Sequence, residues 1–132
     1  MFKNADVFSG FSVDDLDKAR RFYGEVLGFE VVDEGDDMGL HLRFANGGRH
    51  FIYPKDDHRP ATFTVLNFPV DDLKQAMDAL RDKGVQFEHL DLGGGAKTDE
   101  EGVLRGLSVN MGPDIAWFKD PAGNVLAVLQ ES

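Results

Sequence analysis

One short phrase occurs twice in the sequence, as VDDLDKA from Val13 to Ala19 and as VDDLKQA from Val70 to Ala76. The two copies are 57 residues apart and agree at five of their seven positions. Each copy follows a short run rich in Phe, Val and Thr, which is typical of a strand, and each leads into a helical pattern. Because both copies should form the same supersecondary unit, the chain is expected to contain one unit used twice.

The helical pattern after each phrase comes from apolar residues spaced three and four apart, which places them on one helix face. Aspartates at the start of each phrase can accept hydrogen bonds from the first free backbone N–H groups, and a glycine can adopt the left-handed conformation that ends a helix. The expected caps and stops are Asp14 and Gly28 in the first copy, and Asp71 or Asp72 with Gly84 in the second.

Three extended segments follow each helix, so the chain is expected to have an α+β fold of two βαβββ modules, residues 1–55 and 61–132, within a single domain of 132 residues. The sixth strand is expected to end near His89. The glycine-bearing stretch Leu92–Gly112 after it has weak periodicity, which favours a long loop that acts as a lid or is disordered.

Asn46-Gly47 predicts a hairpin in the first module, because both residues tolerate the positive φ of a two-residue type I′ turn. Such a turn would place Arg43 opposite His50. Alternation then sorts the strand residues onto two faces. The face expected to line a cavity carries His41, Arg43, His50 and Ile52, and the face expected to pack on the helix carries Leu40, Leu42, Phe44, Phe51 and Tyr53.

The second module ends in a hairpin around the turn DPAG, Asp120 to Gly123. Its register places Trp117, the single tryptophan, opposite Ala127, where the ring can form a stacking wall for an aromatic or cationic ligand. Asn67 shares a strand face with Phe63 and Val65 and can form a hydrogen bond to a ligand. Ordinary packing of the tryptophan, and solvation of His41, Arg43 and His50, remain alternatives to ligand binding.

The amino-acid composition excludes some kinds of chemistry and argues against some kinds of partner. The chain has no cysteine, which excludes disulfides, a thiolate nucleophile and cysteine-ligated metals. Its formal net charge of −10, with scattered Lys and Arg, argues against a nucleic-acid partner. We find no apolar run long enough for a membrane span and no secretion signal, so a cytoplasmic protein without a membrane partner is expected.

The segments FSVDDLDKARRFYGEVLGFEV and IAWFKDPAGNVLAVLQ, together with the paired modules, resemble the vicinal oxygen chelate superfamily. That superfamily includes glyoxalase I, extradiol dioxygenases, fosfomycin-resistance enzymes and bleomycin-resistance proteins. The resemblance covers nearly the whole chain. It implies two βαβββ modules that form a curved mixed sheet around a concave cavity, and a homodimer.

The metal-dependent members of that superfamily hold a divalent ion with His, Glu or Gln from the first and last strands of both modules. The matching positions in this sequence are all apolar: Phe8, Ile52, Val65 and Ala127. The resemblance therefore implies that the usual metal site is absent, and no cofactor is expected.

Three functions stay open. The first is a metal-free protein that binds a small organic molecule, as the bleomycin-resistance branch does. The second is a metal-dependent glyoxalase-like lyase or isomerase, or a dioxygenase, with atypical ligands such as His41 and His50. The third is an accessory domain whose groove meets another protein. The expected ligand contacts of the first function are His41, Arg43, His50, Asn67 and Trp117.

Overall fold

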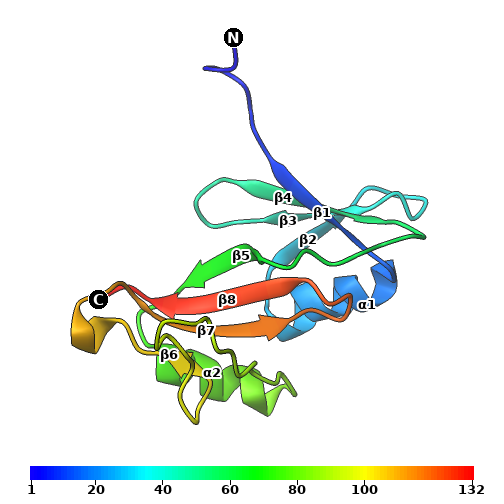
Figure 1. Cartoon of the computed structure of the whole chain (residues 1–132). Helices are drawn as coiled ribbons and strands as arrows, with labels where there is room; N and C mark the ends of the chain where they lie inside the picture. The colour runs from blue at the N-terminus through cyan, green and yellow to red at the C-terminus, as the bar shows by residue number, and fades with distance from the viewer. The chain divides into compact units, whose positions relative to one another are not determined.

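The computed structural model describes residues 1–132 and divides them into two compact units, Met1–Pro60 and Ala61–Ser132. Each unit contains one four-stranded mixed sheet and its own short helix, so the predicted α+β class is confirmed (Figure 1). None of the helices combines the length and the apolar character that crossing a membrane requires.

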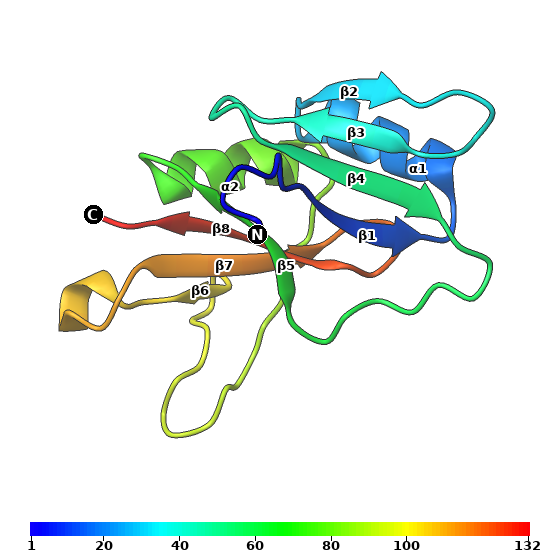
Figure 2. The ribbon, with the colours of Figure 1, turned by 90° about the horizontal axis from the view of Figure 1, so that it is seen from above.

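The first unit follows the predicted order of one strand, one helical segment and three strands. Its elements are β1 (Ser9–Val13), α1 (Leu16–Arg21), the π-helical segment η1 (Phe22–Val26), β2 (Glu30–Asp33), β3 (Leu40–Arg43) and β4 (Arg49–Pro54). The strand order across the sheet is β1-β4-β3-β2, with β1 parallel to β4 and the other neighbours antiparallel (Figure 2).

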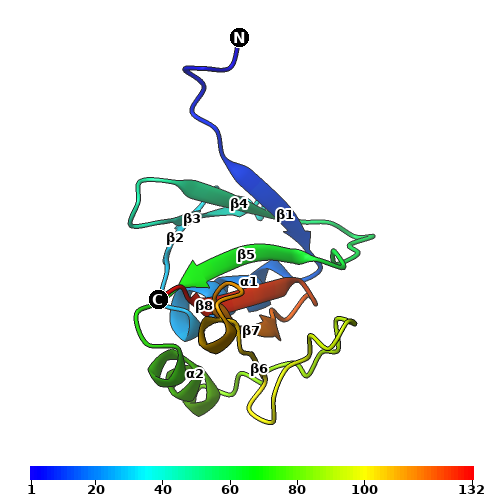
Figure 3. The same ribbon diagram turned by 60° about the vertical axis from the view of Figure 1, so that its left-hand side comes forward.

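The second unit repeats this arrangement. Its elements are β5 (Thr64–Pro69), α2 (Leu73–Asp82), β6 (Val103–Leu104), the 3₁₀ segment η2 (Leu107–Val109), β7 (Asp114–Lys119) and β8 (Val125–Gln130). The order is β5-β8-β7-β6, again with one parallel pair, β5 and β8 (Figure 1). The helix α2 packs against β8 on one face of this sheet (Figure 3). The sequence repeat is therefore a structural repeat.

Equivalent aspartates cap the two helices. The Asp15 carboxylate accepts from the Lys18 backbone N–H at 3.1 Å, and Asp72 accepts from that of Gln75 at 3.0 Å. The prediction of Asp14 as the first cap is wrong by one residue, because Asp15 is the residue with extended backbone directly before α1. A glycine with positive φ follows each helical segment, at Gly28 and Gly84 as predicted.

The sixth strand lies later in the chain than predicted. Val103 and Leu104 form β6 inside the stretch expected to be a loop, and they pair with β7. The segment before residue 92 forms isolated bridges, Phe87 with Phe118 and Asp91 with Lys97, but no strand, so the strand expected to end near His89 is absent. The excursion between α2 and β6 projects from the unit (Figure 2).

The turn between β3 and β4 differs from the prediction. Gly47 N–H donates to Phe44 O at 3.0 Å, and Phe44 N–H donates to Gly48 O at 2.9 Å, which encloses three loop residues instead of two. Gly47 has φ +91° while Asn46 keeps a negative φ. This is a type I turn followed by a glycine bulge, a common three-residue hairpin. The DPAG turn has the same pattern.

The longer turn moves the register of β3 and β4 by one residue. Leu42 lies opposite His50 and His41 lies opposite Phe51, whereas Arg43 lies opposite Arg49. Because side chains alternate along a strand, this shift exchanges the faces of every β4 residue. The buried apolar residues of the first unit are Val13, Leu16, Ala19, Tyr23, Leu40, Leu42 and Ile52.

Candidate ligand-binding site

His41 and Arg43 share the sheet face of the first unit that points away from its buried core. Phe51 lies opposite His41 on this face, and the ring centroids of Phe8 and His41 are 5.9 Å apart. The predicted pairing of His41 with Arg43 on one face therefore holds. The predicted assignment of Phe51 and Tyr53 to the helix-packing face is wrong, because the register shift turns both outward.

His50 does not belong to this face, which corrects the predicted trio. It is 1% exposed and its ring centroid lies 4.4 Å from that of Phe11. Its Nδ1 hydrogen-bonds the Ser9 hydroxyl at 2.6 Å, and its Nε2 has no partner. Burial, with a smaller effect from His41, lowers the pKa of His50 to about 4. His50 is thus a neutral core residue, and His41 and His50 point to opposite faces and cannot jointly ligate one metal ion.

His41 makes close polar and aromatic contacts. Its Nδ1 hydrogen-bonds Glu34, which directly follows β2. Its ring centroid lies 5.0 Å from that of Phe51. Two clefts, of about 550 Å³ and 280 Å³, are both lined by His41 and Glu34, and the smaller is otherwise apolar, with Phe8, Met38 and Phe51. The imidazole therefore stands between a polar cleft and an apolar one.

Arg43 lies on the same sheet face as His41 and forms no ion pair with its neighbours. The register places Glu30 opposite it in β2 and Arg49 opposite it in β4. No carboxylate lies within ion-pair distance of the Arg43 guanidinium. Arg49 instead stacks over the Phe8 ring at 4.3 Å and reaches the exposed Asp6 at 3.4 Å. Arg43 is therefore an exposed cation with free hydrogen-bond donors.

In the second unit Trp117 lies opposite Ala127, as predicted. Its indole N–H donates to the Thr64 hydroxyl at 3.0 Å, and the residue is 9% exposed. A β-bulge in β5 changes the predicted neighbours of Asn67: the pairing places Thr64, in place of Val65, on the Asn67 face. Asn67 itself is exposed and lies opposite Ala127.

A cleft of about 600 Å³ opens beside Trp117 and Ile115 within the second unit. Its lining is mainly apolar and includes three of the most exposed large apolar side chains of the chain: Leu92, Val109 and Met111, at 55%, 60% and 82% exposure. Exposed apolar side chains that converge on one cleft are typical of a binding surface.

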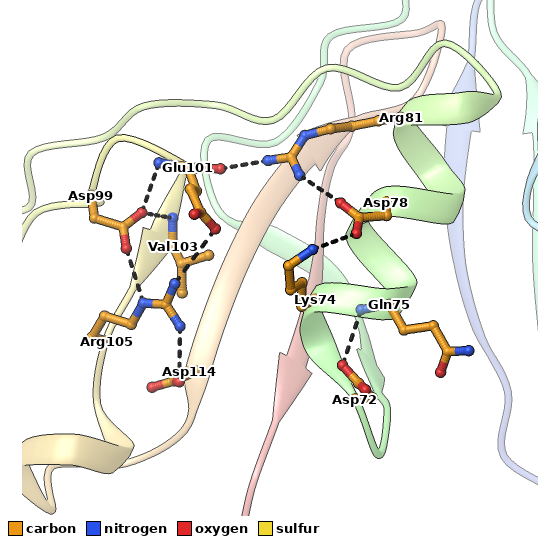
Figure 4. Close-up of polar contacts among 10 residues, drawn as sticks. All are labelled: Asp72, Lys74, Gln75, Asp78, Arg81, Asp99, Glu101, Val103, Arg105 and Asp114. Carbon is orange, nitrogen blue, oxygen red and sulfur yellow. Dashed lines mark hydrogen bonds and ion pairs between the residues drawn. The ribbon is translucent and has the colours of Figure 1, made fainter.

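Ion pairs of Arg105 stabilise one wall of this cleft. Arg105 pairs with Asp99 at 2.9 Å, with Asp114 at 3.5 Å and with Glu101 at 3.7 Å (Figure 4). Asp114 also accepts from the backbone N–H groups of Gly106 and Leu107. The hydrogen bond to Asp99 raises the pKa of Arg105. Polar contacts therefore hold the segment from Asp99 to Leu107 together with the packing of the buried Val103.

Neither unit offers the donor set of a metal centre at the strand positions that the family uses. In the first module the turn glycine equivalent to Gly123 is Gly47, so the last-strand position is Phe51, and Ile52 was the wrong residue. Phe51 is apolar, as are Phe8, Val65 and Ala127. No cluster of three or more His, Cys, Asp or Glu side chains with ligating geometry occurs in the chain. The apolar side chains at these four positions do not fit a divalent metal ion.

Sequence reasoning missed three groups near these clefts. Glu34 and Arg49 were not considered, because their roles depend on strand pairing. The apolar side chains of Val109 and Met111 were treated only as part of a loop. A signal for the true register was available: FANGG matches DPAGN in the second module when Gly47 is aligned with Gly123.

Comparison with known proteins assigns the family. The Glyoxalase/Bleomycin resistance protein/Dioxygenase superfamily profile matches residues 7–128, so the chain belongs to this superfamily. This confirms the resemblance seen in the sequence. No curated protein sequence matches the chain.

Solved structures share the fold at low sequence identity. A glyoxalase family protein from Bacillus anthracis has a TM-score of 0.67 at 17% identity, covering 95% of this chain and 93% of its own. TnmS3, an antibiotic binding protein from Streptomyces sp. CB03234, has a TM-score of 0.67 at 22% identity, with coverage of 95% and 93%. The fosfomycin resistance protein FosX from Listeria monocytogenes has a TM-score of 0.70 at 13% identity, with coverage of 100% and 94%.

Proposed function

We propose that this protein binds a small organic molecule with an aromatic ring in the cleft beside Trp117. The observation that carries the proposal is the convergence of Val109, Met111 and Leu92 on that cleft, each with more than half of its surface exposed. A flat apolar ligand would cover these side chains and gain roughly 25 cal/mol for each Å² of apolar surface removed from water. The likeness in fold to an antibiotic binding protein supports this class of function.

The polar contacts of the ligand are proposed from the same sheet face. Asn67 is exposed opposite Ala127, the strand partner of Trp117, and can donate or accept a hydrogen bond. The indole N–H is already bonded to Thr64, so Trp117 contributes its ring surface and no hydrogen bond. In the first unit, His41 and Arg43 remain proposed polar contacts for a ligand on their own sheet face, while His50 is withdrawn because it is buried on the other face.

Fluorescence of Trp117 tests the proposal, because it is the only tryptophan and it lines the cleft. We would titrate the purified protein with bleomycin and with a panel of aromatic antibiotics. Saturable quenching or a spectral shift is the expected result. Val109→Asp and Met111→Asp place a charge on exposed cleft positions and should weaken binding by at least about tenfold, roughly 1.4 kcal/mol.

The matched control is Val7→Asp, since Val7 is 77% exposed and does not line this cleft. Its affinity should equal that of the unmodified protein. Equal affinities for the Val109→Asp and Val7→Asp variants would place the ligand elsewhere and refute the proposal. Metal-dependent turnover of the hemithioacetal of methylglyoxal and glutathione, after addition of Ni²⁺ or Zn²⁺, would favour the enzymatic alternative over a binding protein.

We also propose that the protein forms a homodimer. This proposal rests on the family resemblance alone. Sedimentation equilibrium of the untagged chain tests it, because the monomer has a mass of 14.6 kDa. A single species at that mass over the micromolar range would refute it.

A further inference from the structure

Met111 is the most exposed large apolar side chain of the cleft beside Trp117, at 82% exposure. The chain contains four methionines and no cysteine, so thioether sulfur is the only sulfur that an oxidant can attack. Because oxidation of a side chain follows its exposure, the methionines should differ widely in reactivity. Met77 is 2% exposed in the core of the second unit and provides an internal reference.

The backbone around Met111 is fixed to the wall of the cleft. The Met111 N–H donates to Gly106 O at 2.9 Å, just after the 3₁₀ segment η2. Gly106 has no room for a side chain, because a Cβ there would lie 2.4 Å from Pro113 O. Asp114 accepts from the Gly106 N–H at 2.9 Å and pairs with Arg105 (Figure 4). The segment is therefore a closed turn that keeps the Met111 thioether at the cleft.

Oxidation would change the polarity of this wall. A thioether is apolar, whereas a sulfoxide carries an oxygen that accepts hydrogen bonds and is solvated in water. A flat aromatic ligand that covers Met111 would remove this water. The other lining residues are mainly apolar, among them Val109 and Ile115, so covering the sulfoxide costs the free energy of desolvating a polar group.

We propose that Met111 is a redox-sensitive modification site that regulates ligand binding in the cleft beside Trp117. A peroxide converts the thioether to the sulfoxide, which lowers the affinity of the cleft for an aromatic ligand, and reduction of the sulfoxide restores it. This inference rests on the proposed function of the cleft.

The modification needs only a peroxide as the oxidant. A lone pair of the Met111 sulfur attacks one peroxide oxygen, the S–O bond forms and the O–O bond breaks. The proton on the transferred oxygen passes to the leaving hydroxide, which gives water when the oxidant is hydrogen peroxide. Sulfur loses two electrons. The reverse step uses two thiols of a methionine sulfoxide reductase system, which are oxidised to a disulfide while the oxygen leaves as water.

A second exposed methionine provides a matched control. Met38 is 68% exposed and lines the smaller cleft of the first unit with Phe8 and Phe51. It does not line the cleft beside Trp117. Oxidation of Met38 should therefore proceed readily without changing ligand binding beside Trp117.

The test uses 8-anilinonaphthalene-1-sulfonate, an aromatic dye that fluoresces in apolar sites, with the full-length protein. Energy transfer from Trp117, the single tryptophan, reports dye bound near this residue. After treatment with hydrogen peroxide, peptide mass spectrometry measures the oxidised fraction of each methionine and checks that Trp117 is unmodified. Met111 and Met38 should be oxidised well before Met77. The affinity for the dye should fall by about fivefold or more, as expected for covering an unpaired polar group.

Each variant is compared with itself before and after peroxide. Peroxide should leave the affinity of Met111→Leu unchanged, because leucine is apolar and has no sulfur. Met38→Leu should lose affinity by the same factor as the unmodified protein. Without any oxidant, Met111→Gln should bind the dye more weakly than Met111→Leu, since the amide is polar like the sulfoxide. Methionine sulfoxide reductases for both epimers, with dithiothreitol, should restore the affinity of the oxidised protein. Far-UV circular dichroism checks the folding of each sample.

The inference is overturned if Met111 is oxidised no faster than Met77, or if peroxide lowers the affinities of Met111→Leu and Met38→Leu equally. If the dye binds near Trp117 and its affinity survives full oxidation of Met111, the redox inference fails and the proposed function stands. If neither the dye nor the antibiotics bind to the unmodified protein, the proposed function fails and the regulation fails with it.

Discussion

Acid should destabilise the first unit through His50, and the size of the effect follows from its burial. The pKa of His50 is lowered from 6.5 to about 4 by burial, so protonation is far less favourable in the folded state than in the unfolded state. At about 1.4 kcal/mol for each pKa unit, this difference corresponds to about 3 kcal/mol. The full stability is present above pH 6.5 and is lost as the pH falls from about 6.5 to about 4.

The variant His50→Leu isolates this contribution. Leucine fills most of the volume of the imidazole and carries no titratable group, and it removes the unpartnered Nε2. Urea unfolding followed by far-UV circular dichroism, at pH 7.5 and at pH 4.5, gives the free energy of unfolding at each pH. The stability of the unmodified protein should fall by about 2 to 3 kcal/mol more than that of His50→Leu across this range.

An exposed histidine provides the control. His89→Leu should follow the pH dependence of the unmodified protein, because His89 is exposed. An NMR titration of the His50 Hε1 resonance measures the same quantity directly. If the His50→Leu and unmodified profiles run parallel, or if His50 titrates near its ordinary pKa, then the face assignment of β4 is wrong.

Three further perturbations test local features of the fold. Gly47→Ala should cost about 1 kcal/mol in thermal unfolding, because Gly47 has φ +91° and no atom within 4 Å of an added Cβ, so backbone strain is the whole effect. Asp72→Ala should lower stability by about 1 kcal/mol through loss of the α2 cap, whereas Asp71→Ala should change it little. Arg105→Gln should speed amide hydrogen exchange over residues 99–107 relative to Arg59→Gln, a change at a residue outside this network.

The repeat allowed most of the fold to be predicted. Two copies of one phrase predicted two βαβββ units, and each unit of the structure has one strand, one helical segment and three further strands in that order along the chain. The terminating glycines were also predicted correctly, and Asp72 was one of the two residues predicted as the second cap, because turn and cap preferences act over a few residues. The sixth strand was misplaced because Val103–Leu104 is only two residues long and lies in a stretch without periodicity.

The candidate site was predicted only in part. Trp117 opposite Ala127 was predicted correctly, because the proline and glycine of DPAG leave one favoured turn, whereas the bulge in β5 gave Asn67 other neighbours than predicted. The first hairpin was predicted one residue out of register, since Asn46-Gly47 fits a two-residue turn and a three-residue turn with a glycine bulge equally well. His50 was therefore placed beside His41, although it is buried in the core.

The sequence by itself determined the repeated unit, its helices and its turn positions, because these depend on local periodicity and on the backbone freedom of single residues. Only the tertiary structure decided which face each β4 side chain occupies. In that strand both alternate sets contain large ring side chains, His50 in one and Phe51 and Tyr53 in the other, so the choice depends on packing against α1 and β1. A shift of one residue exchanges the two faces, and with them the surroundings of His41 and Arg43.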